Sequence, residues 1–230
     1  MPPHHAEALD IVYEDDCLLV LNKPSGLLSV PGRGPDKADC LSSRVQAVHP
    51  NALVVHRLDM DTSGLIVMAK GLDMQRRLSG SFAQRDTHKT YTALVWGHIS
   101  VQQPEQAWQT IDLPLLVDWP NRPKSKVCPE QGKPSLTHWR LQHTGPANGA
   151  ITVPYSRLEL HPVTGRSHQL RVHMLSLGHP ILGDPLYGAA FQGHDGVMRA
   201  APRLMLHATA LSLPHPATGD RMAWTSPPPF

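Results

Sequence analysis

The chain has 230 residues, of which 40% are apolar and 17% charged, and its formal net charge is +2. The apolar fraction is enough for a packed core, which excludes a chain that is disordered throughout. The longest apolar runs have four or five residues, such as residues 65–69, so no segment approaches the ~20 apolar residues of a transmembrane helix.

The N-terminal residues and the cysteines indicate the cellular compartment of the protein. Residues 1–8 lack the basic and apolar segments of a secretory signal, and we expect them to be flexible. Cys17, Cys40 and Cys128 are an odd number without CxxC spacing, which argues against a disulfide framework. Free thiols are typical of a reducing compartment, so the sequence predicts a cytoplasmic protein.

The charge is unevenly distributed along the chain. Residues 1–16 contain five acidic and no basic residues, so the remaining 21 basic and 14 acidic residues give the body a net charge of +7. A basic body favours a polyanionic partner such as nucleic acid. An excess of this size also serves solubility alone, and charge by itself does not separate the two interpretations.

The first elements of the chain are short strands, a loop and one short helix. Residues 11–13 and 18–21 predict a hairpin, and the Gly- and Pro-rich residues 23–35 predict a loop. Residues 41–48 fit a short helix, and residues 64–69, with their β-branched content, fit a buried strand.

Further along the chain, strands predominate. Residues 73–84 predict a helix with Asp73 as its N-cap, and residues 89–96 predict a strand. Residues 101–131 contain many prolines without a clear period, so we expect a long excursion, which in a compact domain is more often functional than accidental. Residues 136–142 and 157–161 alternate like antiparallel strands.

The last elements complete the fold prediction. Residues 167–177 predict a helix, and residues 204–213 another strand. Because strands and helices do not alternate regularly, we predict an α+β fold with a large mixed, mainly antiparallel sheet and flanking helices. We expect a single catalytic domain over residues 9–226, and residues 194–198 as surface loop.

A first polar cluster spans His56–Gly64, between two apolar strands, where a scaffold presents reactive groups. Asp59 stands between Leu58 and Met60, so a partly desolvated carboxylate is expected there, and such a group needs a cation or its pKa rises. The alternative is a capped turn in which residues 61–63 bond to the local backbone.

A second cluster spans Thr164–His173. If a helix starts near Arg166, then Arg166, Leu170 and His173 share one face, and the field of the helix terminus favours an anion beside Arg166. Arg166 would then pair with Asp59 or bind a phosphate. The alternative is an ordinary amphipathic helix with solvated Arg and His side chains.

A third, weaker cluster is the strand pair Lys89 and Tyr91, whose side chains share one face of a strand and so present a cation beside a phenol. The alternative is that the tyrosine belongs to the core.

The sequence lacks the motifs of several other kinds of functional site. There is no HExxH run or close Cys/His set for a metal, no nucleotide-binding glycine motif and no GxSxG. Neither a metal nor a cofactor is therefore expected. The pair Asp59 and Asp61 keeps a carbohydrate-active hydrolase open as an alternative.

Taken together and in this order, the clusters resemble the RluA-type family of RNA pseudouridine synthases. The resemblance rests on the HRLDxxTSG run at residues 56–64, the basic-x-Tyr strand at Lys89 and Tyr91, and the TGRxHQ[LI]R-x-H run at residues 164–173. Residues 22–26 and 178–184 also look like the family, and residues 113–134 look like its dual-specificity subgroup. As in that subgroup, we expect no S4-like RNA-binding extension before residue 9.

The resemblance implies an isomerase that converts uridine to pseudouridine in RNA without a cofactor. Asp59 would act at the ribose as nucleophile or base, Arg166 would keep Asp59 ionised, and Tyr91 would stack on the uracil or assist proton removal. Leu170 and His56 would belong to the base pocket, and Arg57 would fill the space that the extruded base leaves.

The same resemblance implies that structured RNA is the partner, with one uridine in a tRNA anticodon loop and one in a 23S rRNA hairpin as substrates, and no membrane. Basic side chains would contact phosphates, with Trp119 as a stacking platform unless it belongs to the core. These basic residues are Lys89, Arg122, Lys124, Lys126, Lys133 and Arg171. We expect a monomer. A family member acting on another uridine is the first alternative, and a non-catalytic RNA-binding module a distant one.

Overall fold

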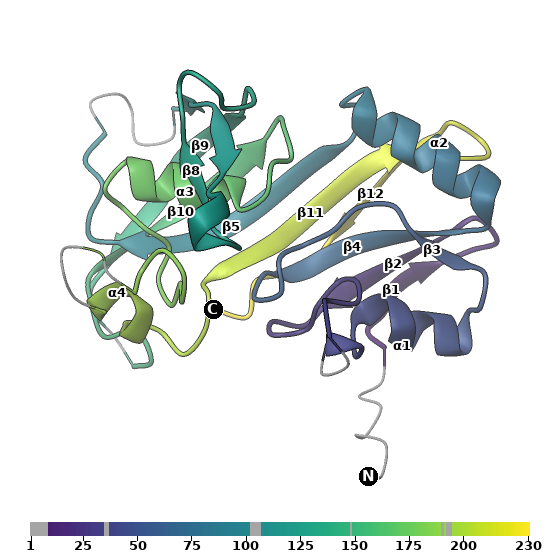
Figure 1. Ribbon diagram of the computed structural model, residues 1–230, viewed down its shortest axis with the longest axis horizontal. Coiled ribbons are helices and arrows are strands. Elements are labelled where there is room, and N and C mark those ends of the chain that lie inside the picture. Colours follow the sequence, from purple (N-terminus) through teal and green to yellow (C-terminus); the bar gives the residue numbers. More distant parts are fainter. Residues whose placement is uncertain (1–8, 35–36, 102–106, 148, 190, 192–194) are drawn as a thin grey trace, which may run out of the picture. The chain divides into compact units, whose positions relative to one another are not determined.

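The structure is a computed structural model that describes residues 9–34, 37–101, 107–147, 149–189, 191 and 195–230 (Figure 1). These residues form two compact units. Unit 1 comprises the chain up to His88 together with Ala208–Pro229, and unit 2 comprises Lys89–His207 with Phe230. The expected flexibility of residues 1–8 lies outside the described residues, and the domain boundaries 9–226 stay a prediction.

Unit 1 is built on a sheet with the strand order β1-β2-β4-β11, in which β3 also pairs with β4 and β12 with β11. β1 and β2 are joined as the antiparallel hairpin that the sequence predicts. The strands are β1 (Ile11–Glu14), β2 (Leu18–Lys23), β3 (Ala52–Val54), β4 (Ser63–Lys70), β11 (Leu206–Pro214) and β12 (Arg221–Thr225).

Two helices belong to unit 1. α1 (Leu41–Val48) has the bounds that the sequence predicts, and Cys40 caps it by accepting a hydrogen bond from the Ser43 amide. α2 (Leu72–Ala83) begins after Gly71, so the prediction that Asp73 is the N-cap is wrong. Gly71 takes this place with a φ of 86°, and Asp73 lies in the first turn of the helix, where its charge still favours the helix dipole.

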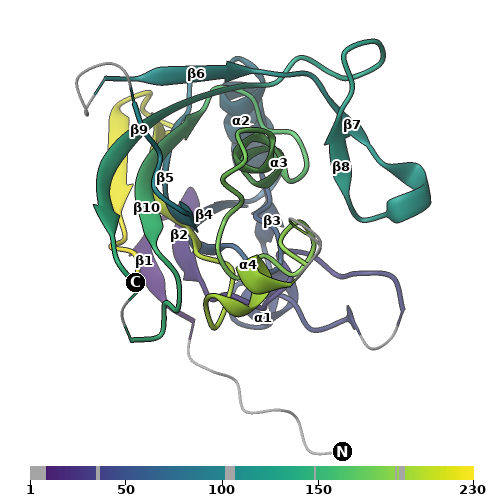
Figure 2. The same cartoon turned by 90° about the vertical axis from the view of Figure 1, so that its left-hand side faces the viewer.

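Unit 2 contains four antiparallel strands in the order β5-β10-β9-β6 and a separate two-stranded hairpin, β7–β8 (Figure 2). The excursion expected at residues 101–131 is therefore partly regular, because β6, β7 and β8 lie within it. The strands are β5 (His88–Trp96), β6 (Gln109–Asp112), β7 (Leu115–Val117), β8 (Ser125–Val127), β9 (Leu136–Gly145) and β10 (Tyr155–Pro162).

The helices of unit 2 are short. α3 (Gln169–Ser176) starts two residues later than expected, because His168 takes a left-handed conformation with a φ of 56°. Arg166 therefore lies in a turn before the helix, and the prediction that it shares a helix face with Leu170 and His173 is wrong. α4 (Gly196–Arg199) is a helical turn in a segment that the sequence predicts to be surface loop, and His194 lies outside the described residues.

Each unit has its own apolar core. Leu65, Val67 and Leu78 belong to the core of unit 1, and Leu158, Leu160 and Leu170 to that of unit 2. The predicted α+β fold with a mainly antiparallel sheet is confirmed. Among the described residues, no helix is long and apolar enough to cross a bilayer.

Candidate active site

The polar run His56–Gly64 connects β3 to β4 in unit 1. Asp59 is half-buried there, next to buried Leu58 and to Met60, whose side chain is 45% exposed. The Thr62 amide donates to the Asp59 carbonyl oxygen at 3.2 Å, which closes a tight turn directly after the aspartate. Asp59 is thus a partly buried residue on a turn at the start of a buried strand.

The buried side chain of Lys23 fixes this turn through hydrogen bonds. Lys23 is 1% exposed, and its ammonium donates to three carbonyl oxygens, those of Pro24 at 2.8 Å, Leu27 at 2.7 Å and Met60 at 2.8 Å. Burying a charge is costly unless hydrogen bonds satisfy it. The three carbonyls satisfy the ammonium, and one of them belongs to the residue that follows Asp59.

Two serines of the loop after β2 complete this contact. The Ser25 hydroxyl donates to the Asp61 carbonyl at 2.7 Å. The Ser29 hydroxyl donates to the Leu58 carbonyl at 2.7 Å and accepts from the Leu58 amide at 3.1 Å. We call Lys23, Ser25 and Ser29 the backbone clamp. Sequence reasoning recognised residues 22–26 only as a flanking resemblance and missed that they fix the backbone on both sides of Asp59.

The two ends of the polar run are fixed as well. The Val67 amide donates to His56 Nε2 at 3.1 Å, and the ring stacks on Phe82 with a centroid distance of 4.6 Å. At the other end Gly64 has a φ of 107°, and a Cβ there would lie 2.4 Å from the Ala208 carbonyl oxygen, so only glycine fits. His56 therefore anchors the run to β4 and α2, and its place in a base pocket stays a prediction.

Arg57 differs from its neighbours because it is exposed. No described residue accepts a hydrogen bond from its guanidinium or forms an ion pair with it. A planar cation that stands out from a fixed backbone is suited to stack or to contact phosphate.

Tyr91 and Leu170 belong to unit 2. Tyr91, on β5, is half-buried and packs against the core cluster that contains Leu170, whose side chain is 6% exposed. Lys89 precedes Tyr91 by two residues, and burial lowers the pKa of its ammonium. A Cβ on Gly165 would lie 3.8 Å from Lys89 Nζ, so the lysine reaches the turn that carries Arg166.

Gln169 organises that turn. Its side-chain oxygen accepts from the Thr164 hydroxyl at 2.8 Å and from the Arg166 amide at 3.0 Å. Its side-chain nitrogen donates to the Leu136 carbonyl at 3.0 Å, which ties the turn to β9. Arg166 is exposed, and its Nε donates to the Pro134 carbonyl at 3.3 Å. The arginine is thus presented by a locked turn instead of by a helix.

Arg171 has another role than the sequence suggests. It is 2% exposed, and its guanidinium forms a two-pronged ion pair with Asp184 at 2.7 and 2.8 Å. The same Asp184 accepts from the amides of Leu186 and Tyr187. The prediction that Arg171 contacts RNA is wrong, because its charge is held inside unit 2, where it fixes the segment after α3.

Apart from Lys89 on β5, the other predicted RNA contacts lie on the β7–β8 hairpin or next to it in the fold. Trp119 is 66% exposed, so the alternative that it belongs to the core is wrong, and the Arg122 guanidinium lies 4.0 Å above its ring. Lys126 is exposed and lies 3.4 Å from Asp118. Lys124 is half-buried, and Lys133 is exposed on a backbone bridge to β7.

The predicted catalytic residues thus divide between the units. Asp59, with Arg57 and His56, belongs to unit 1, whereas Tyr91, Arg166 and Leu170 belong to unit 2. The pairing of Asp59 with Arg166 stays a prediction.

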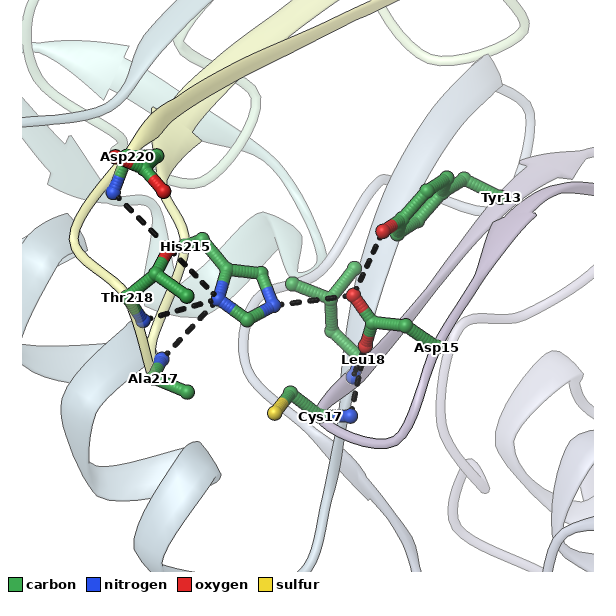
Figure 3. Close-up of polar contacts among 8 residues, drawn as sticks. All are labelled: Tyr13, Asp15, Cys17, Leu18, His215, Ala217, Thr218 and Asp220. Carbon is green, nitrogen blue, oxygen red and sulfur yellow. Dashed lines mark hydrogen bonds and ion pairs between the residues drawn. The ribbon is translucent and has the colours of Figure 1, made fainter.

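One further polar cluster lies in unit 1, where ligand-type atoms of Asp15, Cys17 and His215 are within 4.8 Å of one another (Figure 3). His215 Nε2 donates to Asp15 Oδ2 at 3.0 Å, and His215 Nδ1 accepts from the amides of Ala217 and Thr218. A metal on Nε2 would require the proton on Nδ1, where two N–H groups already point. The arrangement favours a hydrogen-bonded link between two turns over a metal centre.

Residues 17–176 match the model of the RNA pseudouridylate synthase family. The chain is also 49% identical over 222 residues to the dual-specificity RNA pseudouridine synthase RluA of Escherichia coli K12, covering 96% of this chain and 94% of that protein.

The chain belongs to the RNA pseudouridylate synthase family. It is an isomerase that converts uridine to pseudouridine in RNA, so the resemblance of the three motifs is confirmed. The dual-specificity RNA pseudouridine synthase RluA of Vibrio vulnificus is 51% identical over 210 residues, which are 90% of this chain and 78% of that protein.

Solved structures agree with this membership. Human RNA pseudouridylate synthase domain containing 1 superposes with a TM-score of 0.78 and 31% identity, covering all of this chain and 87% of the other. Human RNA pseudouridylate synthase domain containing 4 gives a TM-score of 0.71 at 24% identity and supports the fold alone.

Proposed function

We propose that this pseudouridine synthase has dual specificity and acts on one uridine in a tRNA anticodon loop and one in a 23S rRNA hairpin. The observation that carries the proposal is the identity of 49% over 96% of the chain with a relative named as dual-specific. The match extends through residues 113–134, the segment of the β7–β8 hairpin, on which the resemblance to the dual-specificity subgroup rests.

The proposed reaction rearranges one nucleotide. Asp59 acts at the ribose of the target uridine as nucleophile or base, and the bond between N1 and C1′ breaks. The uracil turns in place, C5 bonds to C1′, the proton on C5 leaves to a base, and N1 gains a proton. Atoms and electrons balance within the nucleotide, so the step requires neither an oxidant nor a group donor.

The other site residues have supporting roles in this proposal. Arg166 keeps Asp59 ionised, and Tyr91 stacks on the uracil or assists the removal of the C5 proton. Leu170 contributes an apolar wall to the base pocket. Each of these roles comes from the family resemblance, and the locked turn of Arg166 and the half-buried position of Tyr91 support it.

The target uridine has to leave its loop before it reacts. Extruding a stacked base costs a few kcal/mol, which a side chain offsets when it fills the vacated space. Arg57 is the candidate, because it is exposed beside the fixed aspartate and presents a planar cation.

Binding of the folded RNA falls to exposed and half-buried cations of unit 2. Arg122, Lys124, Lys126 and Lys133 neutralise phosphates, Trp119 offers a stacking surface, and Lys89 adds a cation near the Arg166 turn. We further propose that the enzyme works as a monomer in the cytoplasm, where its three free cysteines would remain reduced.

The test is direct. The purified enzyme is incubated with unmodified tRNA and 23S rRNA transcripts, and pseudouridine is mapped by primer extension after carbodiimide treatment. We expect one new stop in the anticodon loop and one in the 23S hairpin, and none with Asp59→Asn. A stop in only one RNA class would refute dual specificity, and stops at other uridines would assign the enzyme to a different branch of the family.

A further inference from the structure

A series of hydrogen bonds between buried side chains runs through the interior of unit 2 and ends at the turn that carries Arg166. The side chains come from β9, from α3 and from the turn before α3, and each residue is at most 8% exposed. We call them the buried network, which consists of Thr137, Thr164, Gln169 and His173. Buried polar groups are costly unless they are hydrogen-bonded, so the pairing of each group can be worked out.

His173 determines the direction of the hydrogen bonds at one end of the network. Its Nε2 lies 3.1 Å from the Leu113 carbonyl oxygen, which can only accept, so Nε2 carries the proton. Burial lowers the pKa of His173, so the ring is neutral at pH 7 and has no second N–H group. Nδ1, 2.9 Å from Thr137 Oγ1, is therefore an acceptor, and the Thr137 hydroxyl donates to it.

Gln169 continues the network with both of its amide protons and its amide oxygen in use. Because the Thr137 hydroxyl has already donated its proton, its oxygen accepts from Gln169 Nε2 at 3.0 Å. The same Nε2 also donates to the Leu136 carbonyl at 3.0 Å. The amide oxygen accepts from the Thr164 hydroxyl and from the Arg166 amide. A flipped side-chain amide would bring two N–H groups together at Arg166, so only one orientation satisfies the network.

The two residues at the far end of the network have no access to the substrate. Thr137 and His173 are both 0% exposed, so neither can contact RNA. Gln169 and His173 are four residues apart on α3 and share one face of the helix, and Thr137 bonds to both of them. Any effect of these residues on turnover therefore has to pass through the groups to which they are bonded.

We propose that Thr137 and His173 are positioning residues of the isomerisation. They hold the side chain of Gln169 in the one orientation that binds the Arg166 amide, and thereby fix the backbone from which the Arg166 guanidinium extends. The inference rests on the proposed function, in which Arg166 keeps Asp59 ionised. A long side chain that extends from a fixed backbone has fewer positions to search, which lowers the cost of reaching the reactive geometry.

Thr137→Val tests the middle of the network, because valine has nearly the shape of threonine but lacks the hydroxyl. Thr137→Ser is the conservative variant, which retains the hydroxyl. The control is Thr110→Val on β6, the strand next to β9. It removes a hydrogen bond from a threonine to His138 Nδ1 that is also 2.9 Å long, but Thr110 is exposed.

The first measurement is pseudouridine formation at several RNA concentrations. We expect Thr137→Val to lower kcat about tenfold with KM close to the wild-type value, because the network affects the position of Arg166 and not the binding of RNA. Thr137→Ser and Thr110→Val should have wild-type kcat and KM. The proposal is overturned if Thr137→Val has wild-type kcat, or if Thr137→Ser loses as much kcat as Thr137→Val.

The second measurement is hydrogen exchange at the Arg166 amide, which does not depend on catalysis. Thr137→Val should raise the exchange rate of this amide about tenfold, because Gln169 no longer holds it firmly. Thr137→Ser should exchange at the wild-type rate. Exchange at the wild-type rate in Thr137→Val would overturn the proposal, since the turn would then be fixed without the network.

A double-mutant cycle tests whether Thr137 acts through Gln169. Gln169→Met has a similar length without the polar groups, so it should lower kcat about tenfold or more. Adding Thr137→Val to Gln169→Met should lower kcat by less than about twofold further. If the two losses multiply instead, the residues act independently and the proposal is wrong.

The wild-type enzyme provides a test that remains valid if these variants do not fold. Heteronuclear NMR with isotope-labelled histidine distinguishes the two neutral forms of the ring from the charged form. We expect His173 to be neutral with its proton on Nε2 at pH 7. A proton on Nδ1 would reverse the hydrogen bonds of the network and overturn the proposal. Absence of pseudouridine from tRNA or from 23S rRNA would instead refute the proposed dual specificity, so the two failures are distinguishable.

Discussion

Two regions of this enzyme carry functional polar side chains, but the fold fixes one region with buried groups and exposes the other to solvent. The run around Asp59 in unit 1 is held by buried groups, above all by Lys23, which is 1% exposed. The β7–β8 hairpin in unit 2 instead presents its groups outward, with Trp119 66% exposed and Arg122 stacked on it.

The difference follows from what each region has to do. In the proposed mechanism the carboxylate of Asp59 reacts, and a reacting carboxylate must be held in a narrow range of positions. The backbone clamp meets this need by bonding the backbone on both sides of Asp59. A surface that meets a polyanion needs charges in water, where they attract phosphate over a distance and lose little on contact. Substitutions in the first region should therefore affect turnover and stability, and substitutions in the second should affect RNA binding.

The largest effect is expected from Asp59→Asn. The amide has the same shape but lacks the negative charge and the nucleophilicity of the carboxylate, so turnover should fall by about 10³-fold or more. Thermal unfolding and RNA affinity should remain close to those of the wild type. Single-turnover kinetics on a stem-loop, together with filter binding, measures both. Turnover near the wild-type level would remove Asp59 from the reaction.

The next effect concerns the clamp. Lys23→Met removes the ammonium and leaves three carbonyls without their donor, so the free energy of unfolding should fall by about 3 kcal/mol or more. Turnover should fall at temperatures where the variant is still folded, because the Met60 carbonyl next to Asp59 is released. Urea unfolding and kcat at low temperature are the measurements.

Lys37→Met, at an exposed lysine of the following loop, serves as the control for Lys23→Met. If both variants are equally stable and active, the backbone clamp has no positioning role. The difference that we draw between the two regions would then be wrong.

A smaller effect is expected at Asp15 in unit 1, where a substitution should change the free energy of unfolding but not turnover. Burial raises the pKa of Asp15, but hydrogen bonds from the Cys17 and Leu18 amides, Tyr13 and His215 outweigh it and lower the pKa below its ordinary value of 3.8. A lowered pKa means that the folded state favours the ionised form, so this stabilisation is complete above the ordinary pKa and disappears as the pH falls through the folded value.

Asp15→Asn should therefore lower the free energy of unfolding by about 1–3 kcal/mol at pH 7. The difference from the wild type should shrink below about pH 4. RNA binding and turnover at pH 7 should not change, because the link (Figure 3) lies beside the Lys70 end of β4, whereas the Asp59 run enters the same strand at its other end, at Ser63. Urea unfolding at several pH values measures this, and a difference that is constant down to pH 2 would contradict the assignment.

Local patterns in the sequence predicted local structure well. The β1–β2 hairpin, α1 and the buried strand β4 have closely the predicted bounds, because turn residues and apolar periodicity determine them. The short strands β6, β7 and β8 escaped prediction, since three or four residues carry no period and their pairing depends on distant partners.

The same limit applies to the site. The three motifs predict Asp59, Tyr91 and Arg166 as catalytic residues, but no motif predicts the burial of Lys23, which depends on a carbonyl 37 residues away, at Met60. From the sequence alone, Arg171 has the features of a solvated cation. In the structure it pairs with Asp184, 13 residues further along the chain. Residue type indicates what a side chain can do, whereas its partner decides whether the charge faces the substrate or the interior.

The smallest predicted effect tests the outward-facing region. Trp119→Ala removes an exposed aromatic surface without leaving a cavity, so unfolding should be unchanged within about 0.5 kcal/mol. If a base stacks on Trp119, RNA affinity should fall about tenfold, while turnover at saturating RNA remains at the wild-type level. Val48→Ala, which removes a 65% exposed apolar side chain from α1, is the control. A loss of turnover without a loss of affinity would contradict the assignment. Trp119 would then affect the chemical step, which we expect only of residues in the clamped turn of unit 1.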